Sequence, residues 1–290
     1  MIVLATQQPR DAEVPITRWS LDELALKLVN DHAEQAMSRS TIQRILSQAE
    51  LQPHRSRYWL HSEDPDFEAK VLDVARLYLD APRLYQHGEL VICVDEKTGI
   101  QALERKYPTK PMEQGRPERR EYEYIRHGTR CLLASLVVTT GEVIGDVTAR
   151  RTRRDFCAHL RRMAELFADA SKVHWVMDNL NTHWSLQLCR LFARLNGIKL
   201  QPRALKTGAQ RRAYLTNPEH KHVIHFTPKH GSWMNQIEIW FSRLTRQLLH
   251  RGNFRSTRDL AAQIRDYIVY YDRCHAKPYR WTYTGQPLTA

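Results

Sequence analysis

The stretch Leu90-Val91-Ile92-Cys93-Val94-Asp95-Glu96 runs five apolar residues directly into two carboxylates. An unbroken apolar run has no polar face to offer water, so the pattern predicts a strand that is covered on both sides. Such a strand belongs in the middle of an α/β sheet with helices packed against it. Because reactive groups in open α/β sheets gather beyond the carboxyl ends of the strands, Asp95 is a candidate site residue. An Asp after a strand is also a common turn former, so Asp95 needs partners before it indicates a site.

The segments that follow predict the rest of the sheet. Runs suited to strands at 131–139 and 142–148 are split by Thr140-Gly141, which indicates a hairpin. A helix that begins at Thr152 and a strand at 172–177 come next. Strand, hairpin, helix and strand is the order of a ribonuclease-H-like core. We therefore expect an α/β fold with a mixed sheet flanked by helices.

Two further acids are expected at the same edge of this sheet. Asp178 directly follows the second strand, and Glu238 lies beside the buried stripe of an amphipathic helix that starts near Gly231. Three carboxylates without basic neighbours repel one another unless cations lie between them. Hard divalent ions prefer oxygen ligands, so we expect two Mg²⁺ or Mn²⁺ ions, roughly 3.5–4 Å apart. Such a pair activates a water or a 3′-hydroxyl and stabilises the departing oxygen of a phosphodiester.

The charge balance of the chain favours a polyanionic partner. The 290 residues contain 44 Lys and Arg against 32 Asp and Glu, a net charge of +12. Nucleic acid is the commonest partner of such a protein. Five separated cysteines without a C-x-x-C pair indicate reduced thiols, and no apolar run approaches the length of a membrane span. We expect a cytoplasmic protein that is nucleoid-associated when bound to DNA, with no membrane partner.

The first 62 residues are expected to form a small helical DNA-binding domain. Ser20 and Glu23 read as one capping box, and Ser40 and Gln43 as a second, each opening a short amphipathic helix. Two such helices are typical of a helix-turn-helix, although an ordinary helical hairpin has the same pattern. The residues expected to contact DNA are Arg39, Ser40, Thr41, Gln43 and Arg44 of the second helix, with Arg55 and Arg57 in a following wing.

The segments on either side of the core are a linker helix and a C-terminal tail. The linker helix is expected within 63–88: it begins at Asp64-Pro65 and runs to about Asp80, and Pro82 and Gly88 mark its end. The catalytic domain is expected over 89–275, with a polar, basic loop at 99–126, and a tail over 276–290.

Two clusters have a simpler explanation than a functional site. His222 and His225 would point to opposite faces of a strand, and no Cys joins them or His220, so we expect packing or surface histidines. The run Arg150 to Arg154 is expected to be a solvated helix start rather than a sequence reader, with a phosphate contact as the alternative.

Three motifs together resemble those of a known family. They are Val94-Asp95-Glu96-Lys97, Asp178-Asn179-Leu180-Asn181-Thr182-His183, and the run from Phe226 through Trp233-Met234-Asn235-Gln236-Ile237-Glu238. They resemble the acidic motifs of DDE transposases, most closely the bacterial insertion-sequence branch of the mariner superfamily. The resemblance covers nearly the whole chain, including Lys277-Pro278-Tyr279-Arg280-Trp281-Thr282-Tyr283.

The resemblance implies a function and a set of residues. Asp95, Asp178 and Glu238 would be the catalytic, metal-binding triad, with Asn179, His183 and Asn235 nearby. Such enzymes cut at terminal inverted repeats and join the 3′ ends to target DNA, commonly at TA. We expect double-stranded DNA as the partner and a homodimer in the DNA complex.

Two departures from the family pattern qualify that assignment. The family usually carries a fuller pair of helix-turn-helix units, and this chain starts inside the second, so we expect an N-terminally truncated copy. The spacing between the second and third acids is also longer than in mariner-type animal elements, because of the basic segment 199–221. A catalytically silent DNA-binding regulator derived from such an enzyme, and a structure-selective nuclease of the same fold, are the alternatives. The role of Glu96 stays open.

Overall fold

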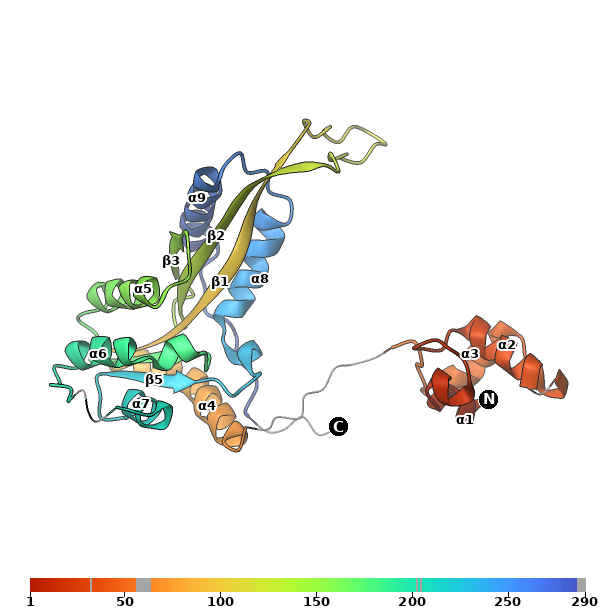
Figure 1. Cartoon of the computed structure of the whole chain (residues 1–290), viewed down its shortest axis with the longest axis horizontal. Coiled ribbons are helices and arrows are strands. Elements are labelled where there is room, and N and C mark those ends of the chain that lie inside the picture. Colours follow the sequence, from red (N-terminus) through yellow and green to blue (C-terminus); the bar gives the residue numbers. More distant parts are fainter. Residues whose placement is uncertain (32, 56–63, 202, 204, 286–290) are drawn as a thin grey trace. The chain divides into compact units, whose positions relative to one another are not determined.

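The computed structural model describes residues 1–31, 33–55, 64–201, 203 and 205–285. The chain divides into two compact units, Met1–His61 and Ser62–Ala290 (Figure 1). Each unit has its own apolar core and is described by itself. Among the described residues, no helix has the length and apolar character needed to cross a bilayer.

The first unit is all helical. Its elements are α1 (Ile2–Thr6), η1 (Pro9–Ala12), α2 (Leu21–Asp31), η2 (Ala33–Gln35) and α3 (Arg39–Gln48). Trp19, Leu24, Leu28, Ile42 and Leu46 form its core. These side chains come from the apolar stripes of α2 and α3 and the loop before them, so packing rather than helix length stabilises the short helices.

The start of α3 differs from the prediction. Ser38, not Ser40, is the N-cap, and its Oγ accepts a hydrogen bond from the Thr41 N–H at 3.2 Å. Ser40 instead lies in the first turn, where its hydroxyl is 2.9 Å from that of Ser38. Ser38 and Ser40 are both suitable N-cap residues, so the sequence does not distinguish them. In the structure the helix begins early enough to bury Ile42, and Ser38 is therefore the cap.

The second unit is built on a five-stranded mixed sheet. Its strands are β1 (Glu89–Arg105), β2 (Tyr124–Val137), β3 (Val143–Thr148), β4 (Lys172–Met177) and β5 (His222–Phe226), in the order β3-β2-β1-β4-β5. The β1–β2 and β2–β3 pairs are antiparallel, whereas β1–β4 and β4–β5 are parallel. The predicted hairpin is present, and Gly141 at φ +75° suits its turn because a side chain there would collide with the Lys277 backbone.

The polar loop predicted at 99–126 is shorter in the structure, where it spans 106–123. Strand β1 continues to Arg105 and β2 begins at Tyr124, so the two strands run on together beyond the other three (Figure 1). Their pairing extends to Arg105↔Tyr124, with irregularities after Lys97 and Gln101. The extension is hard to recognise in the sequence because only Ile100 and Ala102 of β1 are buried there, whereas the paired residues at the start of β2 are exposed.

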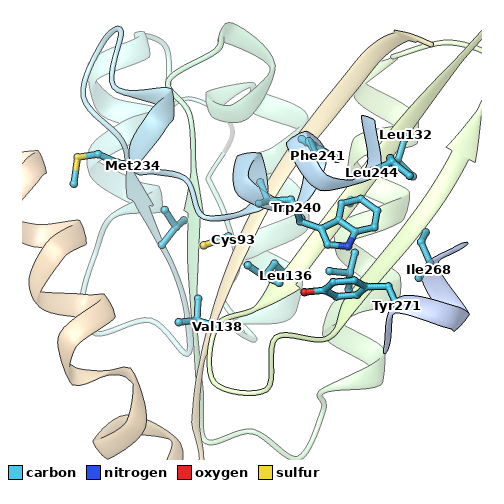
Figure 2. Packing of buried hydrophobic residues seen from close by; sticks show 14 of the residues in the cluster. Cys93, Leu132, Leu136, Val138, Met234, Trp240, Phe241, Leu244, Ile268 and Tyr271 are labelled. Atoms are coloured by element: carbon cyan, nitrogen blue, oxygen red, sulfur yellow. The ribbon is translucent and has the colours of Figure 1, made fainter. Parts of the chain in front are cut away.

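Helices cover both faces of the sheet. Their bounds are α4 (Phe67–Gln86), α5 (Arg153–Leu166), η3 (Asn181–Trp184), α6 (Leu186–Leu195), α7 (Gly208–Leu215), η5 (Ser232–Met234), α8 (Ile237–Leu244), the π-helical turn η6 (Thr245–Leu249) and α9 (Thr257–His275). Helices α4, α8 and α9 pack on one face and α5, α6 and α7 on the other. Figure 2 shows Trp240 and Phe241 of α8 against strand residues such as Leu136, with Tyr271 of α9 beside them.

Two helices depart from their predicted bounds. Helix α4 runs through Pro82 to Gln86 and buries Val74, Ala75 and Tyr78 in the main core, so it belongs to the second unit rather than to a linker. An internal proline costs about 3 kcal/mol, which this burial offsets. The α-helix that carries Glu238 begins at Ile237 rather than near Gly231, because a 3₁₀ turn comes first.

Candidate active site

The sheet brings the three predicted acids to one edge. Asp95 lies within β1 and is only 6% exposed, Asp178 follows the last residue of the adjacent parallel strand β4, and Glu238 lies in the first turn of α8. Glu238 is exposed and Asp178 is half-buried. Two strands and one helix from separate parts of the sequence therefore direct carboxylates to the same end of the sheet.

The electrostatics of Asp95 show how close these groups are. Burial raises the pKa of Asp95, and the charges of Asp178 and Glu238 raise it further, to about 7, although the Glu96 backbone N–H partly opposes the change. That N–H donates to Asp95 Oδ1 at 2.7 Å. A cation bound here would stabilise the ionised form of Asp95, which the neighbouring acids disfavour.

Asn235 links the loop before α8 to Asp95. Its side chain is fully buried, and Nδ2 donates to the Val94 carbonyl at 3.0 Å and more weakly to Asp95 Oδ2 at 3.4 Å. These bonds fix the start of the helix that carries Glu238 against β1. The predicted neighbour of the acids is thus the residue that joins the first acid to the third.

Asp178 is held by a buried histidine. His183 Nδ1 lies 2.5 Å from Asp178 Oδ1, and its ring stacks on Phe156 of α5 at 4.4 Å. Burial alone would lower the pKa of His183, but the bond to Asp178 and the contact with Glu96 raise it to about 10. For Asp178, burial is outweighed by the bond to His183, so its pKa is lowered.

Glu96 is the neighbour whose role the sequence leaves open. It points to the opposite face of β1 from Asp95, as strand alternation requires, and its side chain is 2% exposed. Its Oε2 lies 3.2 Å from His183 Nε2, so His183 is flanked by two carboxylates. Sequence reasoning placed His183 near the acids but could not pair it with Glu96, because the two lie 87 positions apart and the contact depends on the β1–β4 pairing.

The donor set around the acids fits a hard metal ion. Buried oxygens Glu96 Oε1, Asn179 Oδ1 and Asn235 Oδ1 have no hydrogen-bond partner among the described residues. In the same described ranges, no three His, Cys, Asp or Glu side chains are already gathered closely enough to hold a metal ion. The carboxylates therefore share one end of the sheet without forming a closed cage, and this arrangement is called the acidic edge.

The predicted DNA-contacting residues lie in the first unit. On α3, the side chains of Arg39, Ser40, Gln43 and Arg44 are exposed around the buried Ile42. Thr41 is less available, because its hydroxyl is 2.9 Å from the Ser38 cap. Arg55 is exposed, and Arg57 lies outside the described residues.

Comparisons with known proteins agree with this geometry. A family model described as DDE superfamily endonuclease matches residues 90–261, more than half of the chain. The Mos1 mariner paired-end complex with Mn superposes with a TM-score of 0.51 at 12% identity, over 88% of this chain and 73% of that one. The Mos1 strand transfer complex gives 0.51 at 13% identity, over 88% and 72%. No curated protein matches in sequence.

These similarities bear on the predicted fold. At such identities the structural matches carry the fold alone, and they confirm the predicted ribonuclease-H-like α/β core with a helical region before it. The family model spans Asp95, Asp178 and Glu238, so the three acids lie inside the matched segment.

Proposed function

Because the chain belongs to the DDE superfamily of endonucleases, we propose that it is a transposase. In this proposal it binds the terminal inverted repeats of an insertion sequence, cleaves phosphodiester bonds with two divalent ions and joins the 3′ ends to target DNA at TA. The observation that carries the proposal is the acidic edge, where Asp178 and Glu238 raise the pKa of the buried Asp95 after burial itself has done so. The complexes of Mos1, including a strand transfer complex, support it by similarity of fold.

Asp95, Asp178 and Glu238 are the residues that would hold Mg²⁺ or Mn²⁺. All three offer hard oxygen ligands, which both ions prefer. Bound there, two ions would activate the attacking water or 3′-hydroxyl and offset charge on the departing oxygen. A Mos1 mariner complex was solved with Mn, which supports the choice of ion.

Hydrogen bonds from neighbouring residues hold the carboxylates of Asp95 and Asp178 in place. Asn235 fixes Asp95 through Oδ2, and the Glu96 N–H fixes it through Oδ1. His183 and the Leu180 N–H both bond to Oδ1 of Asp178, at 2.5 and 3.1 Å, which leaves Oδ2 without a hydrogen-bond partner among the described residues. Ligands held before substrate arrives need little reorganisation during the reaction.

The helical first unit would recognise the element ends. Helix α3 presents two arginines and two short polar side chains on its exposed face, the residue types that reach base edges and phosphates. We place α3 in the major groove as the recognition helix of a helix-turn-helix, with Arg55 beside the DNA backbone. Two element ends require two copies of the site, so we propose a homodimer in the DNA complex.

Nicking of supercoiled plasmid tests the function. A plasmid that carries both ends of the element should be nicked at those ends in Mg²⁺ or Mn²⁺ but not in EDTA, and Asp178→Asn should abolish nicking. The matched control is Asp169→Asn, the same chemical change at an exposed carboxylate. Binding to the ends without metal-dependent cleavage would instead indicate the silent regulator, and cleavage directed by branched DNA rather than by the ends would indicate the structure-selective nuclease.

A further inference from the structure

Four arginines at the start of α5 form a second feature near the acids. Arg150, Arg151, Arg153 and Arg154, here called the arginine cluster, are all exposed. None of them takes part in an ion pair with a described residue. Four guanidinium groups within five positions repel one another, and arginine is the residue best suited to phosphate.

The nearby acid does not neutralise this cluster. Asp155 is occupied in the α5 capping box, where its Oδ2 accepts from the Thr152 N–H at 3.1 Å and from the Thr152 hydroxyl at 2.6 Å. The capping box therefore fixes the backbone that carries the arginines, and the Asp155 carboxylate is bound to Thr152 rather than to an arginine. The Thr148 hydroxyl, which donates to the Arg150 carbonyl at 2.8 Å, holds the other end of the segment.

Helix α5 reaches the acidic edge through Phe156, its first buried residue. Phe156, two residues after Arg154, stacks on His183 at 4.4 Å, and His183 bonds to Asp178. The start of α5 is thus linked to the second acid through the contact of Phe156 with His183.

A surface cavity of about 620 Å³ completes the arrangement. Arg150, Arg153 and Arg154 line it together with Gln187 of α6 and with Ala149, Thr152 and Asp155 of the capped segment. The cavity also lies at the N-terminus of a 14-residue helix, whose dipole favours an anion there. Three arginines, an amide donor and a helix N-terminus therefore line one hollow, whose carboxylate Asp155 is already held in the α5 cap.

We propose that the arginine cluster binds DNA phosphates that flank the scissile phosphate on the α5 side of the acidic edge. This inference rests on the proposed function, because it takes the acidic edge as the place of cleavage. The strand that reaches the acids would continue across the α5 start, where Arg153 and Arg154 each meet a phosphate. The contact is to the backbone, so it is independent of base sequence.

The salt dependence of DNA binding tests the cluster. We would measure binding of the full chain to a random-sequence duplex of about 60 base pairs, in EDTA, by fluorescence anisotropy from about 50 to 200 mM KCl. For Arg153→Ala/Arg154→Ala, the slope of log K against log salt should fall in magnitude by about 2, one for each lost phosphate contact. Arg153→Lys/Arg154→Lys should keep most of the slope, because the charge remains.

A matched pair on the other face of the sheet controls for net charge. Arg258 and Arg265 of α9 are exposed, and Arg258→Ala/Arg265→Ala removes the same two charges. Its slope should stay near that of the wild type. Equal slopes for the two alanine pairs, or no change for the α5 pair, would overturn the proposal. The lysine pair keeps both charges, so its slope should stay close to that of the wild type if the residues bind phosphates. A reduced slope in a folded lysine variant would contradict binding to the DNA backbone.

The same measurements separate this inference from the proposed function. If the wild type cleaves element ends while the α5 pair keeps its full slope, only the arginine cluster is wrongly assigned. If the wild type binds no DNA at any salt concentration, the proposed function fails together with it. If the α5 slope falls as expected but no metal-dependent cleavage occurs, the cluster is a DNA-binding surface of a chain that does not cut.

Discussion

Strands β1 and β4 pair over Glu89–Cys93 and Lys172–Val176, with ionisable groups at both ends of this paired stretch. The two ends differ in how the charges are partnered. At the start, Glu89 Oε2 lies 2.9 Å from His174 Nε2, His174 Nδ1 lies 3.0 Å from His225 Nε2, and His225 Nδ1 lies 2.8 Å from Asp73 Oδ2. This histidine chain joins the sheet to α4. At the finish lie Asp95 and Asp178.

Counting protons shows that the histidine chain is internally satisfied. Three hydrogen bonds between two carboxylates and two imidazoles need three N–H groups, and two neutral rings supply only two. One of the four groups therefore carries an additional proton, and burial lowers the pKa of His174 although its hydrogen bond with Glu89 opposes that change. Every ring nitrogen has a partner, so the chain needs no ligand from outside.

The acidic edge has no such balance. Four carboxylates (Asp95, Glu96, Asp178 and Glu238) share one buried imidazolium at His183 and the nearby Arg151. Burial is common to both ends, so burial alone does not mark a functional site. The difference teaches that a buried polar cluster calls for an external cation when its own charges leave an excess of one sign.

Replacing Asp95 should have the largest effect and should separate stability from activity. Asp95→Asn is expected to lower metal-dependent cleavage by at least about 10³-fold, roughly 4 kcal/mol of transition-state stabilisation. In EDTA, the same change should raise the free energy of unfolding by about 1–2 kcal/mol, because one of the mutually repelling carboxylates is gone. Cleavage assays and urea unfolding with and without Mn²⁺ measure both effects.

Asp169→Asn serves as the control for this comparison, since that carboxylate is exposed. It should change neither cleavage nor the stabilisation that Mn²⁺ gives to the wild type. A loss of stability in metal-free Asp95→Asn would show that the acidic edge is balanced after all, by contacts like those of the histidine chain.

The sequence predicted the acidic edge because its signals are local. Asp95 and Asp178 each end an apolar run, and parallel pairing of the two runs follows from the order of elements. Capping at Thr152 was readable for the same reason, since the box spans four residues.

The remainder depends on contacts between distant segments. The Glu96–His183 contact needs the β1–β4 register, and the histidine chain needs α4 packed across three strands. Pro82 predicts that α4 stops early and serves as a linker, whereas the core that overrides the proline is assembled from α8, α9 and the sheet. Whether a helix continues through a proline depends on burial by segments distant in sequence, which the neighbouring residues alone do not reveal.

His222 tests the effect of burial on a histidine with no carboxylate partner in the described part of the chain. It lies on the opposite face from the histidine chain, stacks on Trp175 and accepts from the Trp175 Nε1–H at 3.3 Å. Burial, and then the charge of Lys221, lowers its pKa to about 4 from 6.5. The unfolded chain then binds the extra proton first, so stability is complete above pH 6.5 and falls by up to about 3 kcal/mol as the pH drops to 4.

The measurement is the free energy of unfolding of wild type and His222→Gln across that pH range. The variant should lack this part of the acid sensitivity, and the difference between the two curves isolates His222 from other groups. Exposed His250→Gln is the control and should follow the wild type. Parallel curves for wild type and His222→Gln would contradict the assignment.

Breaking the histidine chain should affect stability and leave catalysis intact. His174→Gln removes the link between Glu89 and His225 and is expected to cost about 2 kcal/mol of unfolding free energy. Cleavage by the folded variant at low temperature should stay within about threefold of the wild type, because the chain contacts none of the acids. A cleavage defect as large as that of Asp95→Asn would mean that both ends of the strands serve the reaction.

Glu96 should show the smallest effect, because it acts through His183 rather than on a ligand. Glu96→Gln keeps the volume but removes the charge that lies 3.2 Å from the buried ring, so the ring is held less firmly against Asp178. The Mn²⁺ concentration for half-maximal cleavage should rise by about tenfold, the usual cost of losing a residue that orients a metal ligand. The stabilisation by Mn²⁺ in thermal unfolding should shrink in parallel, whereas a defect confined to the maximal rate would place Glu96 nearer the reacting groups. Unlike Asp95→Asn, Glu96→Gln should not raise the free energy of unfolding in EDTA. The carboxylate that it removes is already paired with His183, so the change takes away a favourable contact rather than a repulsion.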